Sequence, residues 1–130
     1  MSAAPQPIGR IAIVSAQEAA ESQADGSAAL IVDVREPREF ESLRAPGAAL
    51  LPLAEFVARH ADLPRDRQLL LVCRSGSRSL RAATFLMQQG FSNVANVDGG
   101  MIAWRNAGLP VRSGALEPGE GEFTIPSGER

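Results

Sequence analysis

Short apolar runs alternate along the chain with segments whose apolar positions recur at helical spacing. The apolar runs cover residues 11–14, 29–34, 48–51, 68–73 and 94–97. Runs of four to six residues that are almost continuously apolar are typical of strands buried on both faces of a parallel sheet. The pattern therefore predicts five strands, of which the run at 68–73 is the strongest.

Helix signals follow these runs. Ser15 and Glu18 have the spacing of a capping box, so we expect a helix to begin after the first strand. Further helices are expected over residues 36–43, 53–61, 79–89 and 100–107. Pro37 suits the first turn of its helix, and Gly90 suits the position just after a helix end. The alternation predicts an α/β fold with a mainly parallel sheet, in which ligands bind where strands lead into helices.

Both ends of the chain differ in composition from its middle. Residues 1–10 contain two prolines and one glycine. Residues 113–130 are rich in Gly, Glu, Pro and Ser, with few large apolar groups. We therefore expect a flexible lead-in at 1–10, a folded domain at 11–112 and a poorly packed, flexible tail at 113–130.

Composition excludes several classes of function. The chain has 130 residues, 45% of them hydrophobic and 22% charged, which suits one domain. Its formal net charge of −2 argues against sequence-independent binding of nucleic acid. No apolar run approaches the ~20 residues that cross a bilayer, and none near the N-terminus resembles a signal peptide. We expect no membrane partner and a cytoplasmic location.

The chemical inventory is narrow. Cys73 and His60 are the single cysteine and histidine of the chain, so it cannot build a Cys/His zinc site or an internal disulfide by itself. Every one of the 13 basic residues is arginine, which excludes chemistry that needs a lysine. In a reducing compartment Cys73 would remain a free thiol.

Cys73 opens a loop of distinctive composition, Cys-Arg-Ser-Gly-Ser-Arg at residues 73–78, called here the cysteine loop. Its small residues allow a tight curl that turns backbone N–H groups inward, and the start of a helix adds positive potential. Arg74 and Arg78 add two cations, and such surroundings lower a cysteine pKa to ~3.5–7.5. A lone cysteine after an apolar strand is more often a buried, inert residue. The surroundings nonetheless favour a nucleophilic thiolate beside an anion site.

Four further motifs accompany this loop: residues 31–36 (Ile-Val-Asp-Val-Arg-Glu), 46–48 (Pro-Gly-Ala), 97–100 (Val-Asp-Gly-Gly), and Trp104 with 108–111 (Gly-Leu-Pro-Val). In this order around Cys-Arg-x-Gly-x-Arg, they resemble the single-domain rhodaneses, which are thiosulfate-type sulfurtransferases. The resemblance spans about residues 11–111. It implies one rhodanese-like α/β domain with a five-stranded, mainly parallel sheet and helices on both faces.

The resemblance also implies a reaction. Cys73 would be the catalytic nucleophile that attacks the outer sulfur of a donor such as thiosulfate, so that sulfite leaves and a persulfide remains. The persulfide would pass its sulfur to cyanide, a thiol or a protein, with no metal or organic cofactor. Loop amides would stabilise the anionic persulfide, and the two arginines would receive the sulfonate end of the donor. The substrate-binding residues implied are Arg74, Ser75, Gly76, Ser77 and Arg78.

The flanking motifs suggest supporting roles. Asp33 and Arg35 are expected to pair and cap the turn that follows them. Gly99 and Gly100 are expected to allow a tight strand-to-helix turn near the cysteine loop. Arg44 occupies a place where many relatives have the histidine of Gly-His-Ile-Pro-Gly-Ala, so we expect altered contacts there but unaltered chemistry.

Two alternatives differ in class from a free-standing sulfurtransferase. A phosphatase with a cysteine and arginine loop has the pattern Cys-x5-Arg, whereas this chain has Cys-x4-Arg, which encloses a smaller anion, and Val72 stands where many phosphatases have histidine. A persulfide carrier or partner-binding rhodanese module, with incidental turnover, would use the same loop. The sequence disfavours the phosphatase and leaves the carrier open.

Overall fold

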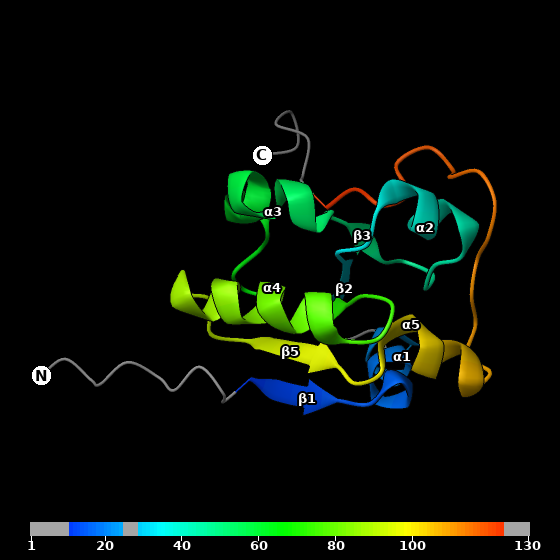
Figure 1. Ribbon diagram of the computed structural model, residues 1–130, viewed down its shortest axis with the longest axis horizontal. Coiled ribbons are helices and arrows are strands. Elements are labelled where there is room, and N and C mark those ends of the chain that lie inside the picture. The colour runs from blue at the N-terminus through cyan, green and yellow to red at the C-terminus, as the bar shows by residue number, and fades with distance from the viewer. Residues whose placement is uncertain (1–10, 25–28, 124–130) are drawn as a thin grey trace, which may run out of the picture.

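A five-stranded sheet forms the centre of the molecule (Figure 1). The computed structural model describes residues 11–24 and 29–123, so the expected lead-in at 1–10 and the last seven residues of the expected tail lie outside the described residues. The strands are β1 (Ala12–Val14), β2 (Leu30–Asp33), β3 (Ala49–Leu50), β4 (Leu69–Val72) and β5 (Val94–Val97). Their order is β1-β5-β4-β2-β3 and every neighbouring pair is parallel, which confirms the predicted fold class.

The register of the central strands brings the ends of three of them to one edge. Asp33 at the end of β2 pairs with Val72 at the end of β4, and Leu71 of β4 pairs with Asn96 of β5. The segments that follow β2, β4 and β5 therefore start side by side. These are the segments in which the sequence predicts the polar motifs.

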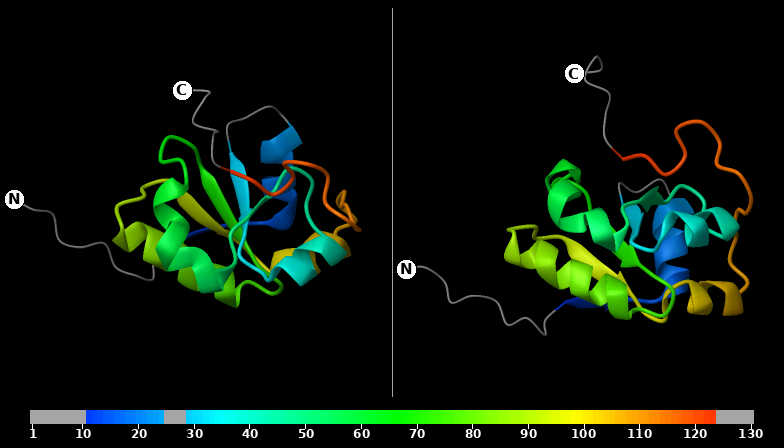
Figure 2. Two further views of the ribbon diagram at one scale, coloured as in Figure 1. Left: turned by 90° about the horizontal axis from the view of Figure 1, so that it is seen from above. Right: turned by 45° about the horizontal axis from the view of Figure 1, so that its top comes forward.

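Helices cover both faces of the sheet (Figure 2). They are α1 (Ala16–Ala24), α2 (Pro37–Ser42), α3 (Leu53–Arg59), α4 (Ser77–Gln88) and α5 (Gly100–Asn106), with a short 3-10 turn at His60–Asp62. Alternate residues of β4 point to opposite faces. Leu69 and Leu71 pack with α3 and α4, while Leu70 and Val72 pack with α1 and α5. No helix in the described ranges is long and apolar enough to cross a membrane.

The predicted helix signals act as expected at α1. The Glu18 amide donates to Ser15 Oγ at 3.0 Å, and the Ser15 amide donates to Glu18 Oε1 at 2.8 Å. α4 differs from the prediction because it begins at Ser77, two residues early. Gly76, with a φ of 110°, turns the chain so sharply that the helix starts within the cysteine loop. This early start places the helix N-terminus close to Cys73.

The stretch from residue 113, which the sequence predicts to be a poorly packed, flexible tail, is mostly exposed as far as residue 123 but makes specific backbone contacts. As far as residue 123, this C-terminal segment runs past α2 and returns to β3 (Figure 1). The Gly114 amide donates to the Glu41 carbonyl at 2.8 Å, and the Leu50 amide of β3 donates to the Gly121 carbonyl at 2.7 Å. Phe123 packs against the core. The segment thus covers the edge of β3.

Arg44 holds this C-terminal segment from within. Its side chain is 1% exposed, and its guanidinium donates to both carboxylate oxygens of Glu120 and to the Gly114 carbonyl. Its backbone forms a two-way bridge with Arg112, each amide donating to the other's carbonyl at 2.9 Å. Arg44, whose side chain is buried, thus forms an ion pair with the partly buried Glu120. Composition does not reveal these contacts with Arg44 because they are polar and join residues far apart in the sequence.

Candidate functional site

The cysteine loop connects β4 to α4, and α5 fixes its backbone. The Met101 amide donates to the Cys73 carbonyl at 2.8 Å, and the Ile102 amide donates to the Arg74 carbonyl at 3.0 Å. These two carbonyls therefore point away from the centre of the loop. Gly76 completes the curl with its positive φ, which residues with a side chain rarely adopt.

Close approach of α5 to the loop requires glycine at its first residue. Gly100 has a φ of 58°, and a Cβ atom there would lie 2.6 Å from the Arg74 carbonyl oxygen. A Cβ on Gly99, whose φ is 74°, would lie 2.7 Å from the Ala103 side chain. The prediction that both glycines allow a tight turn beside the loop is confirmed.

The sulfur of Cys73 is surrounded by hydrogen-bond donors. The Gly76 amide donates to Sγ at 3.1 Å, and the Ser79 hydroxyl lies 3.3 Å from Sγ. Burial raises the pKa of Cys73, but hydrogen bonds from Ser79 and from the amides of Gly76 and Ser75 outweigh it, so the pKa is lowered overall. The direction of this pKa shift is the one that the composition of the loop predicts.

A second polar layer behind the sulfur was not foreseen from the sequence. The Ser79 hydroxyl donates to Asn96 Oδ1 at 2.6 Å, and Asn96 Nδ2 donates to the Gly76 carbonyl at 3.2 Å. Both side chains are buried. The hydroxyl has one hydrogen and faces both Asn96 and the sulfur, so it can turn toward Sγ when negative charge develops there. One available signal was Asn96 itself, a polar residue inside an otherwise apolar strand.

The two arginines of the cysteine loop differ in their surroundings. Arg78 forms a two-pronged pair with Glu39 of α2, at 3.0 and 3.1 Å. Hydrogen bonding to Arg78 lowers the pKa of Glu39 to about 2, so this carboxylate is charged at neutral pH. Arg74 is exposed and, within the described ranges, has no ion pair or hydrogen bond through its side chain. The expected pair of substrate-facing cations is thus one free arginine and one arginine tied to α2.

Asp33 and Arg35 form the pair that the sequence predicts. Arg35 Nε donates to Asp33 Oδ1 at 3.0 Å, and its Nη2 donates to Oδ2 at 2.8 Å and to the Leu43 carbonyl at 2.6 Å. Burial raises the pKa of Asp33, and the bonds from Arg35 offset only part of this effect. The pair joins the end of β2 to the residue that follows α2, which is a supporting role.

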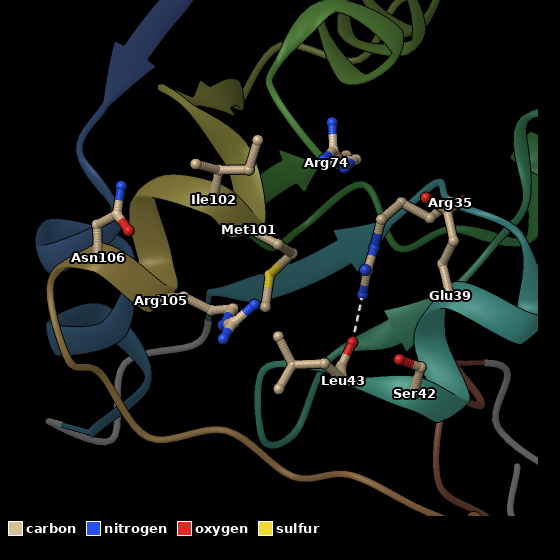
Figure 3. A pocket seen from close by; sticks show the side chains of 9 residues that line it. All are labelled: Arg35, Glu39, Ser42, Leu43, Arg74, Met101, Ile102, Arg105 and Asn106. Atoms are coloured by element: carbon tan, nitrogen blue, oxygen red, sulfur yellow. Dashed lines mark hydrogen bonds between the residues drawn. The ribbon is translucent and has the colours of Figure 1, made fainter.

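A cavity of about 450 Å³ lies beside the cysteine loop (Figure 3). α2 and Leu43 form one wall, Met101 and Arg105 of α5 form the other, and Arg74 lies at the side of the loop. Cys73 is 1% exposed and does not line this cavity. The nucleophilic role that the sequence predicts needs access to the sulfur, whereas the curl that brings amides to the sulfur also encloses it. A donor can reach the sulfur only when the residues around it move.

The site offers a thiol of lowered pKa, amide donors and a free cation. Nowhere in the described part of the chain do three or more His, Cys, Asp or Glu side chains gather closely enough to hold a metal ion. The chemistry that these groups can perform is nucleophilic attack by sulfur, with stabilisation of an anion that forms at the start of α4.

Known proteins share both the sequence and the fold. Residues 15–107 match the family described as "Rhodanese-like domain". A protein of Allochromatium vinosum named "Sulfurtransferase" is 39% identical over 98 residues, which are 75% of this chain and 92% of that protein. A "Thiosulfate sulfurtransferase GlpE" of Pseudomonas entomophila is 40% identical over 72% of this chain and 84% of its own length. The crystal structure of a rhodanese-related protein from Thermoplasma volcanium superposes with a TM-score of 0.72 at 31% identity, covering 78% of this chain and 97% of that one.

Proposed function

The chain belongs to the rhodanese-like domain family, and on this premise we propose that it transfers sulfane sulfur through a persulfide on Cys73. Its relatives support sulfur transfer in general. The observation that supports a persulfide on Cys73 is the position of its Sγ, 3.1 Å from the Gly76 amide and 3.3 Å from the Ser79 hydroxyl. A sulfur held in this way is stabilised as an anion, both as thiolate and as persulfide.

In the first step the Cys73 thiolate attacks the outer sulfur of thiosulfate. A new S–S bond forms, the old one breaks, and sulfite leaves with the electron pair of that bond. Arg74 is the free cation beside the loop and receives the sulfonate oxygens. The amides of Ser75, Gly76 and Ser77 stabilise the terminal sulfur of the persulfide. Arg78 contributes positive charge while its pair with Glu39 holds α2 against the loop.

In the second step an acceptor attacks the terminal sulfur of the persulfide. The S–S bond breaks and Cys73 leaves as a thiolate, which regenerates the starting state. The lowered pKa of Cys73 assists this step because thiols of lower pKa are better leaving groups. Both steps are displacements at sulfur that need no redox cofactor. A reducing compartment such as the cytoplasm keeps Cys73 available for them.

Steady-state turnover tests this proposal. Thiosulfate and cyanide are supplied as donor and acceptor, and thiocyanate is measured. Wild type is expected to produce thiocyanate, while Cys73→Ser stays at the background rate with an unchanged circular dichroism spectrum, because only the sulfur has been replaced. Equal thiocyanate production by both proteins would contradict the proposal.

Burial of the sulfur favours one second candidate, a carrier that delivers its persulfide to a protein partner. A partner that moves the exposed residues of the loop would open the site only on docking. Discharge of the isolated persulfide separates the candidates. A transferase loses its sulfur rapidly to small thiols, whereas a carrier keeps it until a protein acceptor is added.

The structure disfavours a phosphatase. Such an enzyme needs an unpaired arginine at the end of the loop to bind the phosphate oxygens, whereas Arg78 is paired with Glu39. We expect hydrolysis of an aryl phosphate to remain at background, and Cys73-dependent hydrolysis would reverse this assignment.

A further inference from the structure

We propose that Asn96 is a positioning residue for the reaction at Cys73 and that it acts through the Ser79 hydroxyl. The hydroxyl donates its hydrogen to Asn96 while the sulfur of Cys73 is uncharged, and to the sulfur while it is a thiolate. Asn96 is thus the alternative acceptor of a hydrogen bond that reaches Sγ only when negative charge is present there. The part of this inference that concerns the persulfide rests on the proposed function.

The contacts of Asn96 fix the orientation of its side-chain amide. Nδ2 lies 3.2 Å from the Gly76 carbonyl, which can only accept a hydrogen bond, so this nitrogen is the donor. Oδ1 therefore faces the Ser79 hydroxyl, at 2.6 Å, and accepts its hydrogen. Both side chains are buried, so this bond is shielded from water.

The hydroxyl of Ser79 has one hydrogen and three neighbouring acceptors. They are Asn96 Oδ1 at 2.6 Å, the Gly76 carbonyl at 3.2 Å and Cys73 Sγ at 3.3 Å. The Gly76 carbonyl already accepts hydrogen bonds from the Leu80 amide and from Asn96 Nδ2, which occupy both of its lone pairs. The hydroxyl hydrogen is therefore left to Asn96 and the sulfur.

The charge of the sulfur decides which of these two acceptors receives the hydrogen. A neutral thiol donates its S–H to the Ser79 oxygen, which leaves the hydroxyl hydrogen on Asn96. A thiolate attracts the hydroxyl hydrogen instead, because a hydrogen bond to a charged acceptor is roughly twice as strong as one between neutral groups. Asn96 Oδ1 then loses this donor. Asn96 therefore stabilises the uncharged sulfur, whereas the Ser79 hydroxyl stabilises the thiolate.

The two steps of sulfur transfer change the charge of Sγ. When the persulfide forms, the negative charge lies on the terminal sulfur, and the hydroxyl returns to Asn96. When an acceptor attacks the terminal sulfur, the S–S bond breaks, Cys73 leaves with its electron pair as a thiolate, and the hydroxyl turns back to Sγ. The hydrogen bond to Sγ thus forms as the charge develops, which is the condition for accelerating this step.

The charged groups around the sulfur lie outside this exchange. Arg74 follows Cys73 in the loop, and Arg78 interacts electrostatically with Cys73 as well as with Glu39 of α2 and Asp33 of β2. These groups stay in place when Asn96 or the Ser79 hydroxyl is removed. A change in the ionisation of Cys73 after such a substitution therefore reports on the hydroxyl.

The pH dependence of alkylation tests the exchange. Iodoacetamide modifies the thiolate of Cys73, so the midpoint of its rate against pH reports the pKa of this thiol. Asn96→Leu keeps the branched shape of the side chain but removes the acceptor, and it is expected to lower the midpoint by roughly 0.5–1 on the pH scale, the effect of one hydrogen bond. Ser79→Ala is expected to raise the midpoint. The double variant should match Ser79→Ala, because Asn96 acts only through the hydroxyl.

Val94→Ala is the matched control. Val94 lies two residues before Asn96 on the same face of β5 and pairs with Leu69, four residues before Cys73. A valine side chain makes no hydrogen bond, so its loss leaves the midpoint in place. Asn96→Val, which suits a buried strand, replaces Asn96→Leu if that variant does not fold. Unfolding moves the midpoint up toward the ordinary value of a free cysteine, so it cannot imitate the expected fall.

Discharge of the persulfide tests the part that rests on the proposed function. A thiol of lower pKa is a better leaving group. Cyanide should therefore discharge the persulfide of Asn96→Leu faster than that of wild type, and that of Ser79→Ala more slowly. The opposite order would overturn this part of the inference.

The outcomes separate this inference from the proposed function. A midpoint that is unchanged or raised in folded Asn96→Leu overturns the inference, as does a double variant whose midpoint lies below that of Ser79→Ala. Alkylation needs no sulfur donor, so these results are independent of the persulfide. Failure to form any persulfide overturns the proposed function and the discharge step, whereas a lowered midpoint in Asn96→Leu still supports the exchange at the thiol.

Discussion

The cysteine loop and the C-terminal segment (residues 113–123) are both held by polar contacts, but at very different distances along the chain. In the loop, Cys73 Sγ contacts Gly76 and Ser79, three and six residues away. In the C-terminal segment, Glu120 is held by Arg44, 76 residues earlier. A short sequence motif shows the hydrogen-bond donors that lie close to one another along the chain. It does not show an ion pair between residues far apart in the sequence. A contact between near neighbours in the sequence is therefore easier to predict than one between distant residues.

The largest expected effect comes from Gly100→Ala, which tests how strictly α5 fixes the loop. Its Cβ would meet the Arg74 carbonyl at 2.6 Å, so the loop must shift. Displacement of reacting groups by about 1 Å costs roughly a hundredfold in rate, and we expect at least that loss in the rate of persulfide formation. Gly108→Ala is the matched control because Gly108 also has a positive φ, 71°, but nothing lies within 4 Å of its Cβ position. A similar rate in both variants would contradict the account.

Arg44→Ala tests the distant contact. The change leaves several carbonyls without a donor and Glu120 without its main partner, so we expect the free energy of unfolding in urea to fall by about 2–3 kcal/mol. Cleavage by protease within residues 113–123 should become faster. Arg38→Ala is the control, since that side chain is 89% exposed and forms only a surface pair with Glu36. Equal stability of the two variants would show that the contacts of Arg44 do not stabilise the C-terminal segment.

Ser79→Ala tests the hydroxyl that lies behind the sulfur of Cys73. Without the hydroxyl, the thiolate loses a hydrogen bond, so the pKa of Cys73 rises. We expect alkylation by iodoacetamide at pH 7 to slow by roughly tenfold, a typical effect of one hydrogen bond to a charged group, and the pH profile to move upward. Ser92→Ala removes an exposed hydroxyl and serves as control. A slower rate with an unmoved pH profile would indicate a steric role for Ser79 instead.

The smallest effect is expected at the Arg78–Glu39 pair. The folded-state pKa of Glu39 is lowered to about 2 from 4.5, so the stability that the pair contributes is fully present above pH 4.5 and is lost as the pH falls through about 2. Both side chains are about a third exposed, so Glu39→Gln should cost only ~0.5 kcal/mol at pH 7. The difference between wild type and variant, measured by urea unfolding, should shrink over this acidic range. A difference that grows on acidification would reverse the assigned direction.

Much of the fold could be predicted because its signals are local. Five apolar runs became five strands, and the Ser15 capping box starts a helix as expected. The start of α4 was misplaced by two residues because the pattern of apolar positions does not show that Gly76 already turns the chain. The composition of the C-terminal segment does not show its contacts with Arg44 and Leu50, because these join polar groups that are far apart in the sequence.

The contacts of the candidate site between residues close in sequence were predictable, but those made by side chains from other helices and strands were not. The small residues after Cys73 indicated the inward-facing amides, and Asp33 with Arg35 indicated their own pairing. The partners that come from other elements were not foreseen, namely Asn96 behind Ser79 and Glu39 on Arg78. Their identity depends on how β5 and α2 pack against the loop. The burial of Cys73 was missed for the same reason.

The mass of the intact protein tests the central claim most directly. After incubation with thiosulfate and removal of excess reagent, wild type should gain the mass of one sulfur atom, and cyanide should remove it. Cys73→Ser should gain nothing. If wild type gains no sulfur while a small alkylating reagent still modifies its Cys73, the thiol is present and reactive but does not accept sulfane sulfur, and the account is contradicted.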